Sequence, residues 1–284
     1  MGSRMHRFNG RSALVTGASR GIGAATARRL AAEGADIVIT ARTLDEHPTL
    51  PGSLRETADG LRRFGGQVHL VSADLSDADD RSTIVARATE LLGRPLDILV
   101  NNAAAAIYQP LVDFPLKRRM LTFEVNVHAP MDLAQAVLPG MIERGEGWIV
   151  NVSSATAHRW EPPYTLGSLG ATTGIYGASK AALNRMTNAL GAECIGTGVR
   201  INTVEPRSAV LSEGAESLVG TALTPDQIES MEEMVEALTA LCVCPAGRTG
   251  LSHVSLDLIA ELAIDVHDLD GLPMAGAGTV RSRS

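Results

Sequence analysis

Short runs of apolar, β-branched residues alternate with longer stretches of helical character along most of the chain. Such runs are typical of strands that helices cover on both faces. The alternation of strand and helix predicts a parallel sheet with right-handed crossovers, and therefore an α/β, Rossmann-type doubly wound fold with helices on both faces. We expect seven strands, at 12–16, 36–40, 68–71, 98–100, 148–152, 200–204 and 253–256, and helices at 21–33, 54–64, 77–92, 116–144, 176–195 and 227–241.

The length of 284 residues suits one α/β domain, which we expect to span residues 1–284. Three segments interrupt the alternation of strands and helices. Residues 43–53 contain two prolines and are expected to loop out, and 155–174 form an insertion rich in Gly, Pro and Thr. The tail ends in small residues, so we expect it to be flexible after about 270.

Composition narrows the classes of partner. The net charge of −7 argues against nucleic acid, because neutralising phosphates requires a basic face. No apolar run is long enough to cross a membrane, and the N-terminus lacks the apolar segment of a secretory signal. The three cysteines, Cys194, Cys242 and Cys244, lack the spacing of a disulfide framework or a zinc site. We therefore expect a cytoplasmic protein with reduced thiols, no bound metal and no membrane partner.

A glycine-rich turn, TGASRGIG at 16–23, follows the first strand directly and opens the next helix. The free backbone N–H groups and the dipole at a helix N-terminus bind pyrophosphate. Glycines at such a turn allow the backbone to approach the ligand closely. The turn therefore predicts a dinucleotide-binding site, with contacts from Gly17, Ser19, Arg20, Gly21, Ile22 and Gly23.

The end of the second strand indicates which dinucleotide binds. NAD-binding proteins favour a carboxylate there, to hold the ribose 2′-hydroxyl. Here the strand runs into Arg42, which could bind a 2′-phosphate together with Arg20, so NADP(H) is predicted over NAD(H). The alternative is two solvated arginines. Asp74, followed by Leu75, ends the third strand and could accept a hydrogen bond from the adenine or could cap the next helix.

Tyr176 and Lys180 stand four residues apart at the start of a predicted helix, so both lie on one helical face. A nearby ammonium favours the phenolate and lowers the tyrosine pKa, which makes the pair a competent general acid and base. Tyr108 and Tyr164 have no lysine at that spacing. A chance match in this chain has odds of about 2%, and the alternative is a solvated helix face.

The segments TGASRGIG (16–23), LVNNA (99–103), NVSS (151–154) and YGASK (176–180) together resemble the short-chain dehydrogenases/reductases over nearly the whole chain. The resemblance implies hydride transfer with NAD(P)(H) and a catalytic set of Asn, Ser, Tyr and Lys. It also implies a homotetramer or homodimer built partly from the helices at 116–144 and 176–195. Carried onto this chain, the catalytic residues are Asn126, Ser154 (preferred to Ser153), Tyr176 and Lys180, and the cofactor-binding residues include Asn102, Ala103, Tyr176, Lys180 and Pro206.

The chain departs from the family pattern at several positions. Ala104 stands where the family has glycine, and 22 residues separate Ser154 from Tyr176, more than is usual. The insertion must therefore loop out if the two hydroxyls are to meet. Arg207 stands where the family has glycine and could contact the cofactor or an anionic substrate, or could be solvated.

Pro130 follows Asn126 by four residues inside the predicted helix 116–144. Proline has no N–H, so the Asn126 carbonyl loses its helical partner. That carbonyl could hold a water that links Lys180 to solvent, or the proline could simply kink the helix.

These features predict an NADP(H)-dependent oxidoreductase that interconverts a carbonyl and a secondary alcohol on a small apolar substrate, with Tyr176 exchanging the proton. Region 206–242 is expected to cover the substrate, with apolar residues that could line the pocket or belong to the core. Two alternatives remain. One is a 3-oxoacyl thioester reductase, for which Lys117, Arg118 and Arg119 form the only basic cluster; the other is a non-catalytic NADP(H)-binding regulator, which would not need a Tyr–Lys pair. The residues expected to cover the pocket are Val210, Leu211, Leu218, Val219, Leu223, Met231, Met234 and Leu238.

Overall fold

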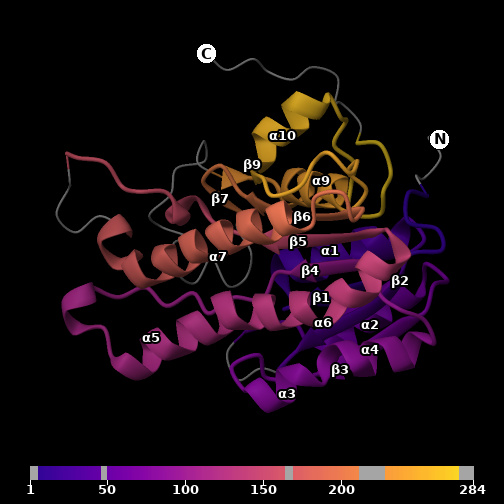
Figure 1. Cartoon of the computed structure of the whole chain (residues 1–284), viewed down its shortest axis with the longest axis horizontal. Helices are drawn as coiled ribbons and strands as arrows, with labels where there is room; N and C mark the ends of the chain where they lie inside the picture. The colour runs from indigo at the N-terminus through magenta and orange to yellow at the C-terminus, as the bar shows by residue number, and fades with distance from the viewer. Residues whose placement is uncertain (1–5, 46–49, 164–168, 211–227, 275–284) are drawn as a thin grey trace.

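The computed structural model describes residues 6–45, 50–163, 169–210 and 228–274. Within these residues, seven parallel strands form one sheet in the order β3-β2-β1-β4-β5-β6-β9 (Figure 1). This topology confirms the predicted doubly wound α/β fold. The strands are β1 (Ser12–Thr16), β2 (Asp36–Ala41), β3 (Val68–Ser72), β4 (Ile98–Asn101), β5 (Gly147–Val152), β6 (Val199–Glu205) and β9 (Ser252–Val254).

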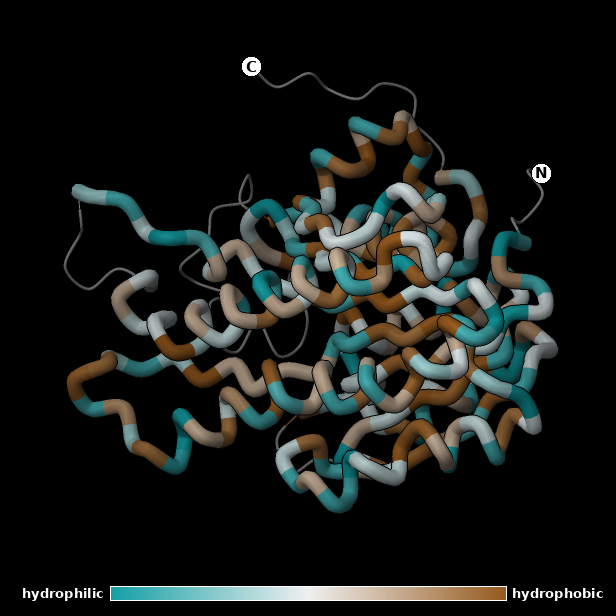
Figure 2. The backbone as a smooth tube through the Cα atoms, in the orientation of Figure 1, coloured by the Kyte–Doolittle hydropathy of each residue, from teal (hydrophilic) through white to brown (hydrophobic). Residues whose placement is uncertain are grey.

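Successive side chains of each strand point to opposite faces of the sheet, and the helices divide accordingly. Ala13 and Val15 face one core, whereas Leu14 between them faces the other. Figure 2 shows hydrophobic positions gathered along the central strands and hydrophilic positions in the outer turns. The first core is covered by α1 (Gly21–Ala32), α2 (Leu54–Arg62), α9 (Met231–Leu241) and α10 (Ser255–Leu262), and the second by α4 (Ile84–Leu92), α6 (Ala129–Arg144) and α7 (Gly174–Glu193).

The remaining elements are short and lie mostly around the carboxyl ends of the strands. Two strands of two residues each form a separate parallel pair on either side of the undescribed segment 211–227. The elements are α3 (Ala78–Ser82), η1 (Leu111–Asp113), α5 (Leu116–Phe123), η2 (Glu124–His128), η3 (Ala155–Ala157), η4 (Leu169–Thr172), β7 (Ala209–Val210) and β8 (Ile228–Glu229).

The helix expected at 116–144 is not one regular α-helix. Residues Glu124–His128 form a π-helical turn, η2, between α5 and α6. Pro130 lies two residues after this turn, and its missing N–H breaks the regular hydrogen-bond ladder at Asn126. The proline therefore marks a change of helix type, at the residue that was expected to be catalytic.

Two further expectations about helices were wrong in detail. The helix expected at 77–92 is divided into α3 and α4, because Asp77 caps the first turn and a new helix begins at Ile84. Helix α10 was not expected at all, because the last helix predicted from the sequence was the one at 227–241. Its apolar residues Leu258 and Ile259 pack into the first core.

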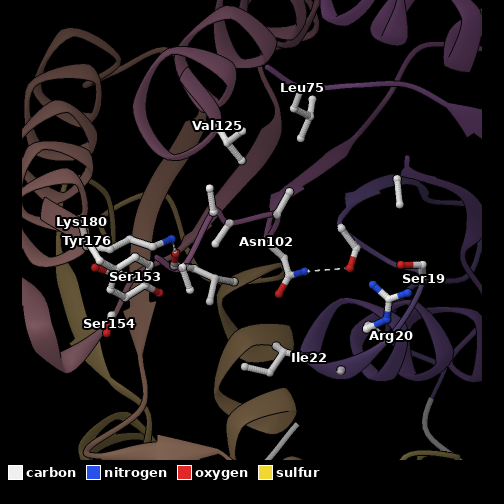
Figure 3. Close-up of a pocket in the computed structure, with 18 of the residues that line it drawn as sticks. Ser19, Arg20, Ile22, Leu75, Asn102, Val125, Ser153, Ser154, Tyr176 and Lys180 are labelled. Atoms are coloured by element: carbon white, nitrogen blue, oxygen red, sulfur yellow. Dashed lines mark hydrogen bonds between the residues drawn. The ribbon is translucent and has the colours of Figure 1, made fainter. Parts of the chain in front are cut away.

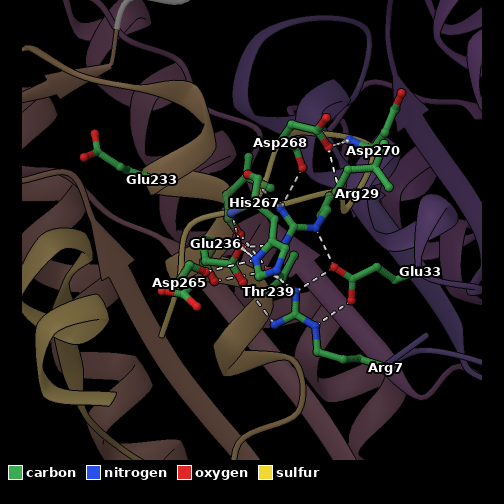
Figure 4. A network of polar contacts seen from close by, with 12 residues as sticks. Arg7, Arg29, Glu33, Glu233, Glu236, Thr239, Asp265, His267, Asp268 and Asp270 are labelled. Atoms are coloured by element: carbon green, nitrogen blue, oxygen red, sulfur yellow. Dashed lines mark hydrogen bonds and ion pairs between the residues drawn. The ribbon is translucent and has the colours of Figure 1, made fainter. Parts of the chain in front are cut away.

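A buried network of ion pairs joins α1, α9 and the chain ends (Figure 4). Arg29 of α1 donates to both Glu33 and Glu236, and the side chains of all three residues are at most 1% exposed. Arg7 donates to Glu33 at 2.8 Å and pairs with Glu236. The backbone N–H of His267 donates to Glu236 at 3.0 Å. These contacts hold segments that are far apart in the sequence, at Arg7, α1, α9 and His267, next to one another.

Candidate active site

A cleft of about 570 Å³ opens at the carboxyl ends of the strands, beside β1 and β4, where the strand order reverses (Figure 3). In doubly wound sheets this switch point is the usual ligand site. Most residues expected from the sequence line this cleft. Those that do are Gly17, Ser19, Arg20, Gly21, Ile22, Arg42, Asp74, Leu75, Asn102, Ala103, Ser154, Tyr176, Lys180 and Pro206, and those that do not are Gly23, Asn126 and Arg207.

The glycine-rich turn forms one wall of the cleft. Gly21 has a φ of +57° and begins α1. The N-cap residue Arg20 makes no side-chain capping hydrogen bond, and the first turn holds no acidic residue. Gly23 faces inward instead, where a Cβ would lie 2.4 Å from Asn102 Nδ2. The N-terminus of α1 borders the cleft through Gly21 and Ile22, and the dipole of a helix N-terminus suits an anion.

Two residues join the ends of β1 and β4 under the cleft. Asn102 Nδ2 donates to the Thr16 carbonyl at 2.9 Å. In return, Thr16 Oγ1 accepts from the backbone N–H groups of Asn102 at 3.0 Å and Ala103 at 3.1 Å. These bonds hold the two strand ends together at the switch point.

Arg20 and Arg42 both line the end of the cleft where the sequence predicts that the adenosine binds. Arg42 is exposed, whereas Arg20 donates to the carbonyls of Pro51 and Gly52. Asp74 does not cap the next helix, because Asp77 is the N-cap of α3. The Asp74 carboxylate instead accepts from the backbone and hydroxyl of Ser76.

Tyr176 and Lys180 lie in the first two turns of α7 at the other end of the cleft (Figure 3). They are 8% and 2% exposed. Lys180 Nζ donates to the Val152 carbonyl at 2.7 Å and lies 5.8 Å from the centre of the Tyr176 ring. Burial lowers the pKa of Lys180 to about 8.

The pKa of Tyr176 differs from the expectation. Burial raises this pKa well above its usual value, and the nearby phenol of Tyr108 adds to the increase, while a hydrogen bond with Ser154 opposes it. The ammonium of Lys180 is directed at Val152 O and not at the phenol oxygen. In this state desolvation therefore outweighs the expected lowering by lysine.

Asn126 and Ser154 have different surroundings. Asn126 is fully buried in η2, where its Oδ1 accepts from Ala105 N at 2.8 Å and its Nδ2 donates to Ser179 Oγ at 3.0 Å. Its side chain thus links the wall of the cleft to α7. Ser154 faces the cleft, and its Oγ accepts from Thr156 Oγ1 at 2.9 Å.

Ser154 and Tyr176 line one cleft although the insertion separates them in the sequence. The first turn of the insertion, η3, packs against α7. His158, just after η3, contacts the buried carboxylate of Glu205 at the end of β6. The insertion is therefore tied to the sheet next to the cleft. Tyr164 lies outside the described residues.

Arg207 is solvated, the simpler of the expected alternatives. Its exposed guanidinium pairs with Asp257 of α10 and does not line the cleft. Its backbone N–H donates to Glu229 of β8 at 3.0 Å.

Several of the apolar residues that were expected to cover the substrate pocket do not line the cleft. Met234 and Leu238 are fully buried in the core, and Met231 borders a neighbouring cavity, whereas Val210 lines the cleft. The others, Leu211, Leu218, Val219 and Leu223, lie outside the described residues.

Tyr108 is one of the cleft residues that the sequence reasoning missed. Its ring lies 5.5 Å from the Tyr176 ring, centre to centre, with a tilt of 56°. Burial raises its pKa. The sequence reasoning set Tyr108 aside because it has no lysine four residues later, but that spacing does not decide whether a tyrosine lines the cleft. The one sequence feature that could have indicated its place is its position shortly after β4.

Comparison with known proteins decides the family. The model of the short chain dehydrogenase family matches residues 11–220. A short chain dehydrogenase of Pseudocercospora fijiensis is 36% identical over 234 residues, which cover 81% of this chain and 70% of that protein. The chain belongs to the short-chain dehydrogenase/reductase family. It is therefore an oxidoreductase, and the predicted resemblance is confirmed.

Two other members of the short-chain dehydrogenase/reductase family indicate the range of related activities. The ketoacyl reductase HetN of a Nostoc species is 34% identical over 202 residues, covering 71% of this chain and 64% of that protein. The solved structure of a 3-oxoacyl (acyl-carrier-protein) reductase from Agrobacterium tumefaciens, with NADP bound, has a TM-score of 0.72 and 29% identity. The similarity covers 87% of this chain and 93% of that structure.

The described residues lack both a membrane-spanning helix and a metal-binding cluster. No helix there combines the length and the apolar character that crossing a membrane requires. No group of three or more His, Cys, Asp and Glu side chains is placed to hold a metal ion.

Proposed function

We propose that this short-chain dehydrogenase/reductase is an NADP(H)-dependent enzyme that interconverts a carbonyl and a secondary alcohol on a small, apolar substrate. One observation carries the proposal. A single cleft joins the N-terminus of α1 and two arginines at one end to the buried Tyr176 and Lys180 at the other. Anion binding and proton exchange are thus available within one cavity.

The residues of the cleft suit a nicotinamide dinucleotide. The first N–H groups of α1 suit the pyrophosphate, and Arg20 and Arg42 suit a ribose 2′-phosphate. Asp74 and Leu75 line the same end, beside the expected adenine position. Lys180 uses one donor on Val152 O, which leaves donors for ribose hydroxyls.

Each residue at the reaction end has a distinct role in the proposal. When bound, the nicotinamide supplies or accepts the hydride. Tyr176 gives its proton to the substrate oxygen in reduction and takes it back in oxidation. The charge of Lys180 favours the phenolate, and Ser154 holds the substrate oxygen. Asn126 acts through the backbone of Ala105 and through Ser179, so it positions the site.

The substrate end of the cleft is largely apolar. Leu121, Val125 and Val210 line it, and the ring of Tyr108 faces Tyr176. Such a wall favours apolar ketones or secondary alcohols over charged substrates.

A 3-oxoacyl thioester is the second candidate substrate. Lys117, Arg118 and Arg119 are exposed on α5, one to two turns before Leu121 and Val125, where they could attract an acidic carrier. HetN and the structure from Agrobacterium tumefaciens carry names of this activity.

Separate titrations of NADPH and NADH, followed by a carbonyl and alcohol screen, test the proposal. We expect tighter binding of NADPH and turnover of simple apolar ketones, with Tyr176→Phe lowering kcat by about 10²-fold or more while NADPH binding is kept. Turnover of 3-oxoacyl thioesters alone would favour the second candidate. Binding without turnover of either class would point to a non-catalytic regulator, and stronger binding of NADH would refute the proposed cofactor choice.

We also propose that the chain forms a homotetramer or homodimer partly through α5, α6 and α7. Leu111, Val112, Leu116 and Met120 are exposed on η1 and α5, and such a patch of apolar side chains is typical of an interface. Light scattering that gives a monomer mass would reject this proposal.

A further inference from the structure

Residues 50–53 pack directly on the glycine-rich turn, outside the reaction end of the cleft. Arg20 Nε donates to the Pro51 carbonyl at 2.8 Å, and Arg20 Nη2 donates to the Gly52 carbonyl at 2.9 Å. Gly52 has a φ of +90°, and a Cβ there would lie 2.5 Å from the Ser19 carbonyl oxygen. The segment can therefore lie this close only because residue 52 has no side chain.

These contacts hold the guanidinium of Arg20 without neutralising it. The two carbonyls are uncharged and take two of its five N–H donors. By contrast, Arg28 and Arg63, which border the adjoining cavity, both pair with Asp270.

The acidic residues near this segment do not neutralise Arg20 either. Asp45, the described acid nearest in sequence to Arg42, pairs with Arg55. Among the described residues, no carboxylate forms an ion pair with Arg20 or Arg42. Arg20 is therefore a cation held in a defined place at the edge of the cleft, with its charge available to an anion.

We propose that residues 50–53 are a positioning element that sets the preference for a 2′-phosphorylated dinucleotide, by holding Arg20 against the expected position of the adenosine ribose. This inference rests on the proposed NADP(H) dependence and adds the element that enforces it. A long arginine side chain loses conformational freedom when it binds a phosphate. The carbonyls of Pro51 and Gly52 impose that order beforehand, so less of the binding free energy is lost to ordering the side chain.

Gly52→Ala in the full chain tests the proposal, with Gly65→Ala as the matched control. Gly65 has a similar φ of +87°, but a Cβ there meets nothing within 4 Å. Both variants carry the same backbone strain, and only Gly52→Ala pushes residues 50–53 away from Ser19 and Arg20.

The measurement is calorimetric binding of NADPH, NADH, 2′,5′-ADP and 5′-AMP to each protein. We expect Gly52→Ala to weaken NADPH and 2′,5′-ADP about tenfold, as for loss of part of a charge-assisted hydrogen bond, and to change NADH and 5′-AMP by less than about threefold. Gly65→Ala should leave all four affinities close to those of the wild type.

A second variant covers the case in which Gly52→Ala does not fold. Arg20→Lys keeps the charge but lacks the planar fork that donates to both carbonyls. It should also lower the ratio of NADPH to NADH affinity, and if the ratio is unchanged the proposal is refuted in that case.

Other outcomes separate this inference from the proposed function. A folded Gly52→Ala protein with the wild-type affinity ratio, or with all four ligands weakened equally, overturns the positioning role and leaves NADP(H) dependence intact. A wild-type protein that prefers NADH and 5′-AMP refutes the cofactor choice itself, and the inference with it.

Discussion

Two buried charged sites in this protein, the network around Arg29 and the single residue Lys180, are organised in opposite ways. In the network around Arg29, every charged group has a partner of opposite charge, and two carboxylates lie between two guanidinium groups. Lys180 is equally buried, yet its Nζ contacts a neutral carbonyl, and among the described residues no carboxylate pairs with it.

The difference separates a structural role from a chemical one. Paired charges keep their ionised state, and the pKa of Glu33 is lowered because the hydrogen bonds and charges of Arg7 and Arg29 outweigh the effect of burial. Burial without a carboxylate partner lowers the pKa of Lys180 to about 8, so this ammonium loses its proton more easily than a free lysine does. The charge that takes part in the proposed reaction therefore lies where no described carboxylate neutralises it.

Breaking the paired set should have the largest effect on stability. Glu33→Gln leaves Arg29 and Arg7 sharing Glu236, so we expect the free energy of unfolding to fall by about 3–5 kcal/mol. Urea denaturation at neutral pH measures this loss, and Glu90→Gln, at an exposed site on α4, is the control. Equal stability of the two variants would mean that the network does not hold the chain ends.

The same variant has a pH signature. The pKa of Glu33 is lowered in the folded state, so its contribution to stability is complete above the ordinary glutamate pKa of 4.5 and is lost as the pH falls through the folded pKa. We expect the stability difference between wild type and Glu33→Gln to shrink in acid. A constant difference would contradict the paired assignment.

Lys180→Met should reveal the unpaired charge through pH. The folded pKa of about 8 lies below the ordinary lysine pKa of 10.5, so between these values the unfolded chain binds the proton that the folded chain has released. The stability of the wild type relative to Lys180→Met should therefore rise with pH across that window, by at most about 3 kcal/mol. Unfolding at pH 7.5 and pH 10 measures it, and a flat difference would show that Lys180 is not desolvated.

The smallest effect is expected where a charged pair is exposed. Arg159 and Glu161 pair at 2.9 Å, with side chains that are 82% and 64% exposed. Arg159→Ala should change the free energy of unfolding by less than about 0.5 kcal/mol, because water and salt screen the pair. A loss comparable to that of Glu33→Gln would show that burial is not what distinguishes the network.

Local patterns were sufficient to predict the sheet and both ends of the cleft. Each strand appears in the sequence as a short β-branched run, and the turn at 16–23 and the pair Tyr176 and Lys180 lie close together in the chain. The spacing of four residues determines a shared helical face before any tertiary contact forms. The positions at the carboxyl ends of the strands follow from the parallel topology.

Tertiary structure decided the features that depend on distant segments. Residues 7, 33, 236 and 267 meet in one network only after α1, α9 and the tail have packed together. Tyr108 meets Tyr176, and Arg20 meets Gly52, across loops whose conformation no local pattern specifies. The pKa of Tyr176 likewise depends on burial and on the direction of Lys180 Nζ, because desolvation is set by the surrounding chain and not by the motif.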